Sequence, residues 1–315
     1  MLNWTLRNPH FDDGQVLWKD AYSGRYQPVA YEEQFDGQWR LFLEGARGFH
    51  HHTGVETSDE YIDDRIYELT GVRDVLLTRQ LGDRAEQFAR KTGRRDRAER
   101  RGVGGRLHLD PKFPIDYFRG KQCVDIGCGA GRWTRALLAL GGDVKSIDVG
   151  DAGLESTRRF NDDVEKVGLF EIGTARPDLV GAFDFALCWG VIMCTHDPKV
   201  AFEKVASTVR PGGSLYIMVY APTYHAGEFV TGARYRYHRE MRTADERAAY
   251  LAELARGDED NMINYLDMLN TFYNWVIDEE TIHGWCAPNG LAEPVFLNRD
   301  EADKCGHHVL IQRPG

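Results

Sequence analysis

Hydrophobic residues in the middle and at the end of the chain occur in short runs that alternate with amphipathic stretches. Short apolar runs predict buried strands, and apolar positions three or four residues apart predict helices. The predicted strands are residues 122–126, 144–149, 169–172, 183–189, 214–220, 292–297 and 307–312. The predicted helices among them are residues 131–140, 152–160, 198–209 and 279–287. This alternation predicts an α/β fold with a doubly wound, mostly parallel sheet.

The first 120 residues follow a different pattern, which is rich in aromatic side chains and in helical spacing. Apolar positions predict helices over residues 32–45, 58–70 and 72–91. Ser58 is typical of a helix start and Gly71 of a helix end. Polar and helical sequence also interrupts the later alternation. The chain is therefore predicted to have a mostly helical N-terminal cap over 1–120, and a sheet domain over 121–315 with a helical cap insertion over 221–277.

Composition narrows the class of protein. The 315 residues are 42% hydrophobic, and the formal net charge of -10 argues against a general grip on nucleic acid. The basic run 91–106 therefore favours an exposed loop over an RNA site. No apolar run reaches the length of about 18 residues that a membrane span needs, and no stretch near Met1 is typical of a signal peptide. The six scattered cysteines indicate reduced thiols and a cytoplasmic location.

Three adjacent histidines invite comparison with a metal site. His50, His51 and His52 are consecutive, so their side chains diverge and do not easily reach one ion. Metal sites generally combine spaced ligands with distant ones, and no such pattern accompanies this run. We therefore expect no metal.

The strongest local signal is the segment VDIGCGAG between a predicted strand and a predicted helix. Gly127, Gly129 and Gly131 permit a sharp turn to which a ligand can come close. The spacing differs from that of a dinucleotide loop, and Asp125 would repel a pyrophosphate but suit an ammonium group. Asp148 ends the next strand, where an acid can accept hydrogen bonds from ribose hydroxyls. An ordinary turn and a helix N-cap are the alternatives.

Four segments together resemble the class I S-adenosylmethionine-dependent methyltransferases: VDIGCGAG, SIDVG, FDFALCWGVIMCTHDP and VRPGGSLYIMVY. The resemblance covers about residues 123–220, and residues 273–312 are similar to the family's final helix and two strands. The segments QFDGQW and GCGAGR and the later aromatic residues are similar to a bacterial subgroup that methylates small molecules, sugars or secondary metabolites. The resemblance implies a Rossmann-like, seven-stranded sheet. It also implies S-adenosyl-L-methionine as cofactor, with S-adenosyl-L-homocysteine as product.

Matched by position, the resemblance assigns a cofactor role to residues in four loops. It places Asp125 near the methionine amino group and Asp148 at the ribose, and it gives Trp189 a π face toward the sulfonium, with a core aromatic as the alternative. The residues so assigned are Asp125, Gly127, Cys128, Gly129, Asp148, Val149, Thr174, Trp189 and Gly190. Thr174 stands where the family often has an acid that binds adenine.

Methyl transfer needs alignment, desolvation and, for a hydroxyl acceptor, removal of a proton. The catalytic candidates are His196, Tyr220 and His225. The subgroup's paired histidines fall on Met193 and Cys194 here, so His196 would be a substitute. Polar side chains of the insertion could line an acceptor site or could merely cover the sheet: Tyr224, His225, Arg234, Tyr235, Tyr237 and His238.

The sequence thus predicts a methyltransferase that acts by SN2 displacement on a small-molecule acceptor, with a hydroxyl oxygen of a sugar or secondary metabolite favoured. N-methylation of a small amine and a non-catalytic S-adenosylmethionine-binding partner subunit are the alternatives. Nucleic-acid methylation is disfavoured, because CWGVIM stands where a (D/N/S)PP(Y/F) motif would follow the fourth strand. No membrane partner is expected, and a homodimer is left open.

Overall fold

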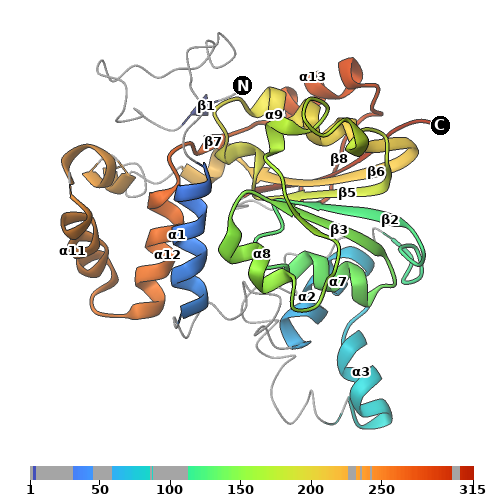
Figure 1. Cartoon of the computed structure of the whole chain (residues 1–315), viewed down its shortest axis with the longest axis horizontal. Coiled ribbons are helices and arrows are strands. Elements are labelled where there is room, and N and C mark those ends of the chain that lie inside the picture. The colour runs from blue at the N-terminus through green and yellow to red at the C-terminus, as the bar shows by residue number, and fades with distance from the viewer. Residues whose placement is uncertain are drawn as a thin grey trace.

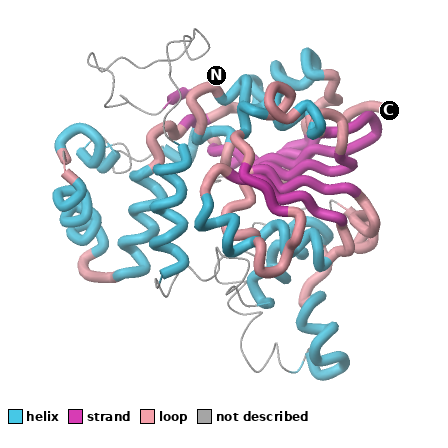
Figure 2. Tube along the Cα trace, viewed as in Figure 1, coloured by secondary structure: helices cyan, strands magenta, loops and turns pink. Residues whose placement is uncertain are grey.

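The computed structural model describes residues 3–4, 31–44, 59–85, 87, 113–225, 232–234, 236–241, 243–299 and 306–315. Its centre is a seven-stranded sheet in the order β4-β3-β2-β5-β6-β9-β8 (Figure 2). The strands are β2 (Gln122–Ile126), β3 (Asp143–Asp148), β4 (Val164–Lys166), β5 (Phe183–Trp189), β6 (Val209–Tyr220), β8 (Val295–Phe296) and β9 (Gly306–Gln312). The predicted α/β, doubly wound sheet is confirmed.

Strand direction decides which residues meet at one edge of the sheet. β2, β3, β4, β5 and β6 pair in parallel, whereas β9 runs antiparallel to β6 and β8 antiparallel to β9. Tyr220, at the end of β6, therefore pairs with Gly306, at the start of β9. We call this side, where the parallel strands end and β9 begins, the carboxyl edge. Ligands of open α/β sheets bind at such an edge.

Helices cover both faces of the sheet (Figure 1). α9 (Pro198–Ser207) and α13 (Glu279–Cys286) bury their apolar sides in one core with β5, β6 and β9. α7 (Arg132–Ala139) and α2 (Asp59–Thr70) share the core on the opposite face. Ile62, Ile66 and Leu69 of α2 have no exposed surface, as their spacing of three and four residues along one helix face predicts.

The two long helices of the N-terminal region differ in what they pack against. α2 belongs to the layer on the sheet, whereas α1 (Tyr31–Glu44) lies beside α12 (Glu259–Asn270) and contacts α8 (Asp151–Thr157) near the carboxyl edge (Figure 1). α11 (Ala244–Ala255) packs on α12. The division of the chain at residue 120 stays a prediction, and residues of α2 that precede it complete the core of the sheet.

The remaining elements are short. A two-stranded pair joins β1 (Asn3–Trp4) to β7 (Trp275–Val276). The single turns of helix are η3 (Gly82–Arg84), η4 (Leu169–Glu171), η5 (Pro177–Leu179), η6 (Ile192–Cys194), η7 (Pro222–His225), η8 (Arg236–Glu240) and η9 (Ala287–Asn289). His50, His51, His52 and the run 91–106 lie outside the described residues.

Two predicted elements are wrong in their bounds. The helix expected over 72–91 starts later, as α3 (Val75–Leu81), and it is interrupted by η3, because Gly82 leaves the helix with a φ of 55°. Ala85 and Gln87 are helical again, and residues 86 and 88–91 lie outside the described residues. The strand expected over 169–172 is η4, and the strand itself lies earlier, at β4. There the Gly168 N–H donates to Glu171 Oε2 over 2.7 Å and closes a turn, while the apolar Leu169 and Ile172 still reach the core.

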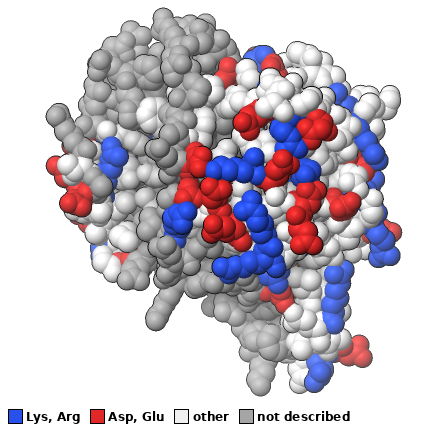
Figure 3. Space-filling view, in the orientation of Figure 1, with Lys and Arg blue, Asp and Glu red and all other residues white. Residues whose placement is uncertain are grey.

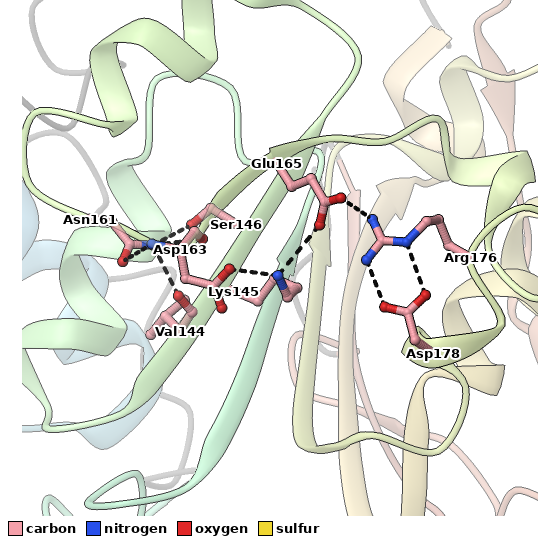
Figure 4. Close-up of polar contacts among 8 residues, drawn as sticks. All are labelled: Val144, Lys145, Ser146, Asn161, Asp163, Glu165, Arg176 and Asp178. Atoms are coloured by element: carbon pink, nitrogen blue, oxygen red, sulfur yellow. Dashed lines mark hydrogen bonds and ion pairs between the residues drawn. The ribbon is translucent and has the colours of Figure 1, made fainter.

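Charged side chains surround the outermost strand β4. Lys145 Nζ lies 2.5 Å from Asp163 and 3.5 Å from Glu165, and Arg176 bridges Glu165 and Asp178 (Figure 4). Charges beside an edge strand discourage its pairing with another chain. Positive and negative side chains intermingle over the surface shown in Figure 3. Among the described residues, no helix is long and apolar enough to cross a membrane.

Candidate active site

The glycine loop forms a left-handed turn between β2 and α7. Gly127, Gly129 and Gly131 have φ values of 73°, 52° and 84°, a region that side chains other than glycine rarely adopt. The N–H groups of Gly127 and Cys128 donate to the Ile147 carbonyl at 2.8 and 3.1 Å, which ties the loop to β3. The local sequence therefore places a glycine-rich backbone, with few side chains, at the carboxyl edge.

Asp148 links the loop to the end of β3. Its Oδ2 accepts from the Gly129 N–H over 2.8 Å, and its Oδ1 accepts from the Gly150 N–H over 2.9 Å. Burial raises the pKa of Asp148, and hydrogen bonds from the backbone of Gly150, Gly129 and Val149 oppose that rise. A carboxylate has about four acceptor positions, so this group retains capacity for ligand hydroxyls.

Asp125 is buried among polar side chains instead of facing outward. Thr134 Oγ1 lies 2.7 Å from Asp125 Oδ2 and 2.8 Å from Ser146 Oγ, and Asn161 Nδ2 donates to Ser146 over 3.0 Å. Burial raises the pKa of Asp125 to about 7, against the lowering effect of Thr134. In this structure Asp125 joins the strand to α7, and its predicted contact with the methionine amino group stays a prediction.

Helix α1 forms a wall over the loop. A Cβ placed on Gly129 would lie 2.1 Å from Trp39 Cζ2, so the indole rests directly against this glycine. Asp36 Oδ1 accepts from the Ala152 N–H over 2.7 Å at the start of α8. Sequence reasoning did not assign Trp39 and Asp36 to the site, although the QFDGQW segment contains both.

The chain's own residues fit the cofactor that the resemblance implies. A side chain on Gly129 would collide with Trp39, and a side chain on Gly153 of α8 would collide with the Gly129 backbone, so only glycine fits at both positions. Bare backbone at that point and an acid with spare acceptor positions suit a ligand with an ammonium group and ribose hydroxyls. Cys128 is buried and Val149 half-buried at the same place.

Trp189 and Gly190 lie at the end of β5. The Arg132 guanidinium stands 4.4 Å from the centre of the Trp189 ring, so a side chain of the protein already faces that π surface. Trp133 and His308 also pack around the ring, at 6.1 and 6.4 Å between centroids. A π contact between Trp189 and the sulfonium therefore stays a prediction. In that contact the sulfonium would share the indole ring with the Arg132 guanidinium.

His196 is held by a tyrosine from α1. Its Nδ1 lies 2.6 Å from Tyr31 Oη, which also accepts from the His196 backbone N–H over 2.8 Å. Phe170 packs on the imidazole at 4.3 Å between centroids. Burial lowers the pKa of His196 and raises that of Tyr31. Both groups are therefore kept neutral, and no described residue hydrogen-bonds to Nε2.

The other catalytic candidates are Tyr220 and His225. Tyr220 ends β6, half-buried against the core that contains α9. The side chain of His225 lies outside the described part of the structure, as do those of Tyr224 and Tyr235. Their roles stay predictions.

The described polar residues of the insertion hold the insertion together. Arg234 donates to the carbonyls of Met268 and Thr271 at 2.8 and 2.7 Å, at the end of α12. Tyr237 donates to Asn270, and His238 bonds to the Leu269 carbonyl. These contacts match the packing alternative for the insertion.

Thr174 lies on an exposed turn after η4. Its hydroxyl donates to the carbonyls of Phe170 and Glu171, at 3.2 and 2.9 Å. The position was counted from a strand expected over 169–172, and the real strand β4 ends at Lys166. Val167, which follows β4 directly, donates its N–H to the Asp148 carbonyl over 2.9 Å and thus lies beside the ribose-binding candidate.

Comparison with known families identifies the chain. A family model described as "Methyltransferase domain" matches residues 107–293, more than half of the chain. A ubiquinone biosynthesis O-methyltransferase of Acinetobacter baylyi is 25% identical over 186 residues, which are 54% of this chain and 73% of the relative. The enzyme of the same name from Thiobacillus denitrificans is 27% identical over 177 residues, 53% of this chain and 73% of that one.

Two solved structures align with part of the chain. An S-adenosylmethionine dependent methyltransferase from Mesorhizobium loti is 18% identical, covers 62% of this chain and 92% of its own, and has a TM-score of 0.42. The magnesium protoporphyrin IX methyltransferase from Synechocystis PCC 6803, with bound SAH, is 14% identical over 62% of this chain and 75% of its own, with a TM-score of 0.39. The family match and the strand–glycine loop–helix unit agree that the chain belongs to the methyltransferase domain family and is a class I S-adenosylmethionine-dependent methyltransferase.

Proposed function

We propose that the enzyme methylates a hydroxyl oxygen of a small-molecule acceptor. Transfer to a hydroxyl needs a base, whereas a neutral amine needs little help. The observation that carries the proposal is that the carboxyl edge holds an imidazole suited to accept a proton, of which His196 is one: it is neutral, bonded through Nδ1, and its Nε2 is unengaged by any described residue. The curated relatives, which are named as O-methyltransferases, support the same chemistry.

The cofactor would lie between the glycine loop, Asp148 and α1. Asp148 would accept from the ribose hydroxyls, Gly127, Cys128 and Gly129 would line the methionine part, and Val149 would pack on adenine. Trp39 would cover the loop and exclude water, which strengthens electrostatic interactions inside the site. Bound there, the cofactor supplies an activated methyl group.

The residues of the chain then align the acceptor and accept its proton. As the acceptor oxygen bonds to the methyl carbon, the carbon–sulfur bond breaks and its electron pair stays on sulfur. The hydroxyl proton passes to a base of the protein. Among the sequence candidates, His196 has a ring nitrogen, Nε2, to which no described residue hydrogen-bonds. Tyr220 offers only a hydroxyl, and the side chain of His225 is not described. A sugar or secondary-metabolite acceptor and a homodimer remain part of this proposal.

The proposal is tested in two steps. Calorimetry with S-adenosylhomocysteine should show micromolar binding, and no binding would contradict the cofactor placement. Methyl transfer from radiolabelled S-adenosylmethionine is then measured with catechol, 3,4-dihydroxybenzoate and simple sugars, and with small primary amines as the comparison. Transfer to a hydroxyl supports the proposal. Transfer to amines alone would favour the N-methyltransferase alternative, and binding without transfer to any probe would favour the partner-subunit alternative.

A further inference from the structure

A buried chain of hydrogen bonds ends on a histidine at the start of β9. His308 Nδ1 lies 2.7 Å from Tyr216 Oη and 3.1 Å from Glu68 Oε1. The Tyr216 hydroxyl donates to Glu68 Oε1 over 2.8 Å, and Arg65 stands 3.4 Å from the other oxygen of Glu68. Three elements far apart in the sequence, α2, β6 and β9, thus meet at one imidazole.

The direction of these bonds places the proton on the His308 ring. Burial, together with the charge of Glu68, raises the pKa of Tyr216, so the phenol stays protonated and gives its single hydrogen to Glu68. Its lone pair then faces Nδ1, which must carry a proton in order to donate. A neutral imidazole protonated on Nδ1 has its lone pair on Nε2. No described residue hydrogen-bonds to Nε2, and the side chain is 20% exposed.

His308 stands at the carboxyl edge beside the end of β5. In the sheet it pairs with Met218, which in turn pairs with Trp189. Its ring lies 6.4 Å from that of Trp189, the residue for which the resemblance implies a place by the sulfonium. Asn298 fixes the backbone here, since Asn298 Oδ1 accepts from the His308 N–H over 3.1 Å. The antiparallel course of β9 therefore brings this histidine to the expected place of methyl transfer.

Two indole side chains pack beside the hydrogen-bonded pair of Tyr216 and His308. The Nε1 atoms of Trp133 and Trp189 are buried and have no hydrogen-bond partner among the described residues. Buried polar atoms of folded proteins are nearly always paired, so these two donors are exceptions to the rule. Trp133 packs at 6.2 Å from Tyr216 and at 6.1 Å from Trp189. The hydrogen-bonded pair of Tyr216 and His308 is thus flanked by two indoles, Trp133 beside Tyr216 and Trp189 beside His308.

We propose that His308, oriented by Tyr216 and Glu68, is the general base that takes the proton from the acceptor hydroxyl, in preference to His196. The inference rests on the proposed O-methyltransferase function. The acceptor O–H bond breaks toward His308 Nε2 while the new oxygen–carbon bond forms and the carbon–sulfur bond breaks. The imidazolium produced is stabilised through Tyr216 and Glu68 and then releases its proton to water. Glu68 and Tyr216 are positioning residues.

The test compares three histidine variants of the full chain. His308→Asn should lower kcat for the hydroxyl probe by about 100-fold or more, the usual range for loss of a general base, with S-adenosylhomocysteine affinity within threefold of the parent. His196→Asn should have a smaller effect on kcat. His283→Asn is the matched control, because His283 also faces a carboxylate, with Nδ1 2.7 Å from Glu293, but lies on the surface of α13.

The positioning role is tested by pH. The charged and titratable groups around the ring are Glu68, Arg65 and Tyr216, with Arg132 beyond Trp189. Glu68→Gln should move the acidic limb of kcat/KM to lower pH, because the imidazolium loses a negative neighbour. Tyr216→Phe should lower kcat more than KM. Neither shift is expected from a residue that only packs.

One measurement needs no acceptor. Nitrogen NMR of the histidine rings should show neutral His308 protonated on Nδ1, and the Nε2–H form would overturn the proposal. Unchanged turnover in His308→Asn, or a larger loss in His196→Asn, would also overturn it. If the parent chain binds S-adenosylhomocysteine but methylates no hydroxyl probe, the proposed function fails, and the NMR result alone decides whether His308 is held in the form of a base.

Discussion

The two halves of the carboxyl edge use their polar groups in opposite ways. At the ends of β2 and β3, the acids take hydrogen bonds from the protein itself: Asp125 from Thr134, and Asp148 from the N–H groups of Gly129 and Gly150. These bonds fix the shape of the glycine loop before any ligand arrives. We call this half the cradle, and its task under the proposed function is to bind the cofactor.

At the ends of β5 and β6 and the start of β9, two histidines are each held by one tyrosine. His196 bonds to Tyr31 at 2.6 Å and His308 to Tyr216 at 2.7 Å, both through Nδ1. Among the described residues, only the second tyrosine donates to a carboxylate, that of Glu68. In one half of the edge the hydrogen bonds hold the loop in shape, whereas in the other half they leave one ring nitrogen of each histidine able to accept a proton.

The largest effect is expected from Asp148→Ala in the cradle. The variant loses the acceptor for two backbone N–H groups and for the ribose hydroxyls, with each bond to a charged group worth about 1.5–3 kcal/mol. Affinity for S-adenosylhomocysteine should fall by roughly 100-fold or more in calorimetry. The control is Asp151→Ala. Asp151 is an exposed acid at the start of α8 that pairs with Lys166 of β4, and this variant should bind S-adenosylhomocysteine as the parent does. Equal affinities would remove Asp148 from the cradle.

The next effect is the pH dependence of the free energy of unfolding that Asp125 causes. Its folded pKa of about 7 lies above the ordinary value of 3.8, so the folded chain binds this proton more tightly. The contribution of Asp125 to the free energy of unfolding is complete below about pH 4 and is lost as the pH rises through 7, by about 1.4 kcal/mol per pKa unit. Asp125→Asn should remove this slope in urea unfolding followed between pH 4 and 8. A slope identical to the parent's would contradict the buried network.

Tyr31→Phe distinguishes the role of His196 from that of His308. It removes the partner of His196 Nδ1 and one hydrogen bond between α1 and the segment after η6, at a cost of about 1 kcal/mol for a hydrogen bond of this kind. We expect weaker S-adenosylhomocysteine binding, by a few fold, because α1 carries Trp39 over the loop. Turnover at saturating cofactor should change far less than in Tyr216→Phe. The reverse order would make the His196 side of the edge the reactive one.

The smallest effect is expected away from the edge, at Asp178→Ala. Asp178 pairs with Arg176 in the exposed cluster beside β4, and Arg176 keeps Glu165 as a second partner (Figure 4). Exposed ion pairs contribute about 0–1 kcal/mol. Chemical unfolding should therefore differ from the parent by less than about 0.5 kcal/mol, and cofactor affinity should be unchanged. A large loss would mean that the strand edge supports the cradle.

Local sequence was sufficient where a feature depends on neighbouring residues. β2 and β5 have the bounds that their apolar runs predict, and the glycines after β2 form the expected turn. Prediction was wrong at residues 169–172, because apolar side chains reach the core from a turn as well as from a strand. The Thr174 assignment was counted from that strand, and the residue lies on an exposed turn.

The sequence by itself determined the alternation of strands and helices, the glycine loop, the acids near the ends of two strands and the family to which the chain belongs. Only the tertiary structure decided which side chains meet. It brought Trp39 onto Gly129, and it brought Glu68 to Tyr216 across 148 positions of the chain. The physical reason is that hydrophobic periodicity reports one face of one element. The pairing of faces, such as the antiparallel return of β9 that places His308 at the carboxyl edge, is settled by packing among distant segments.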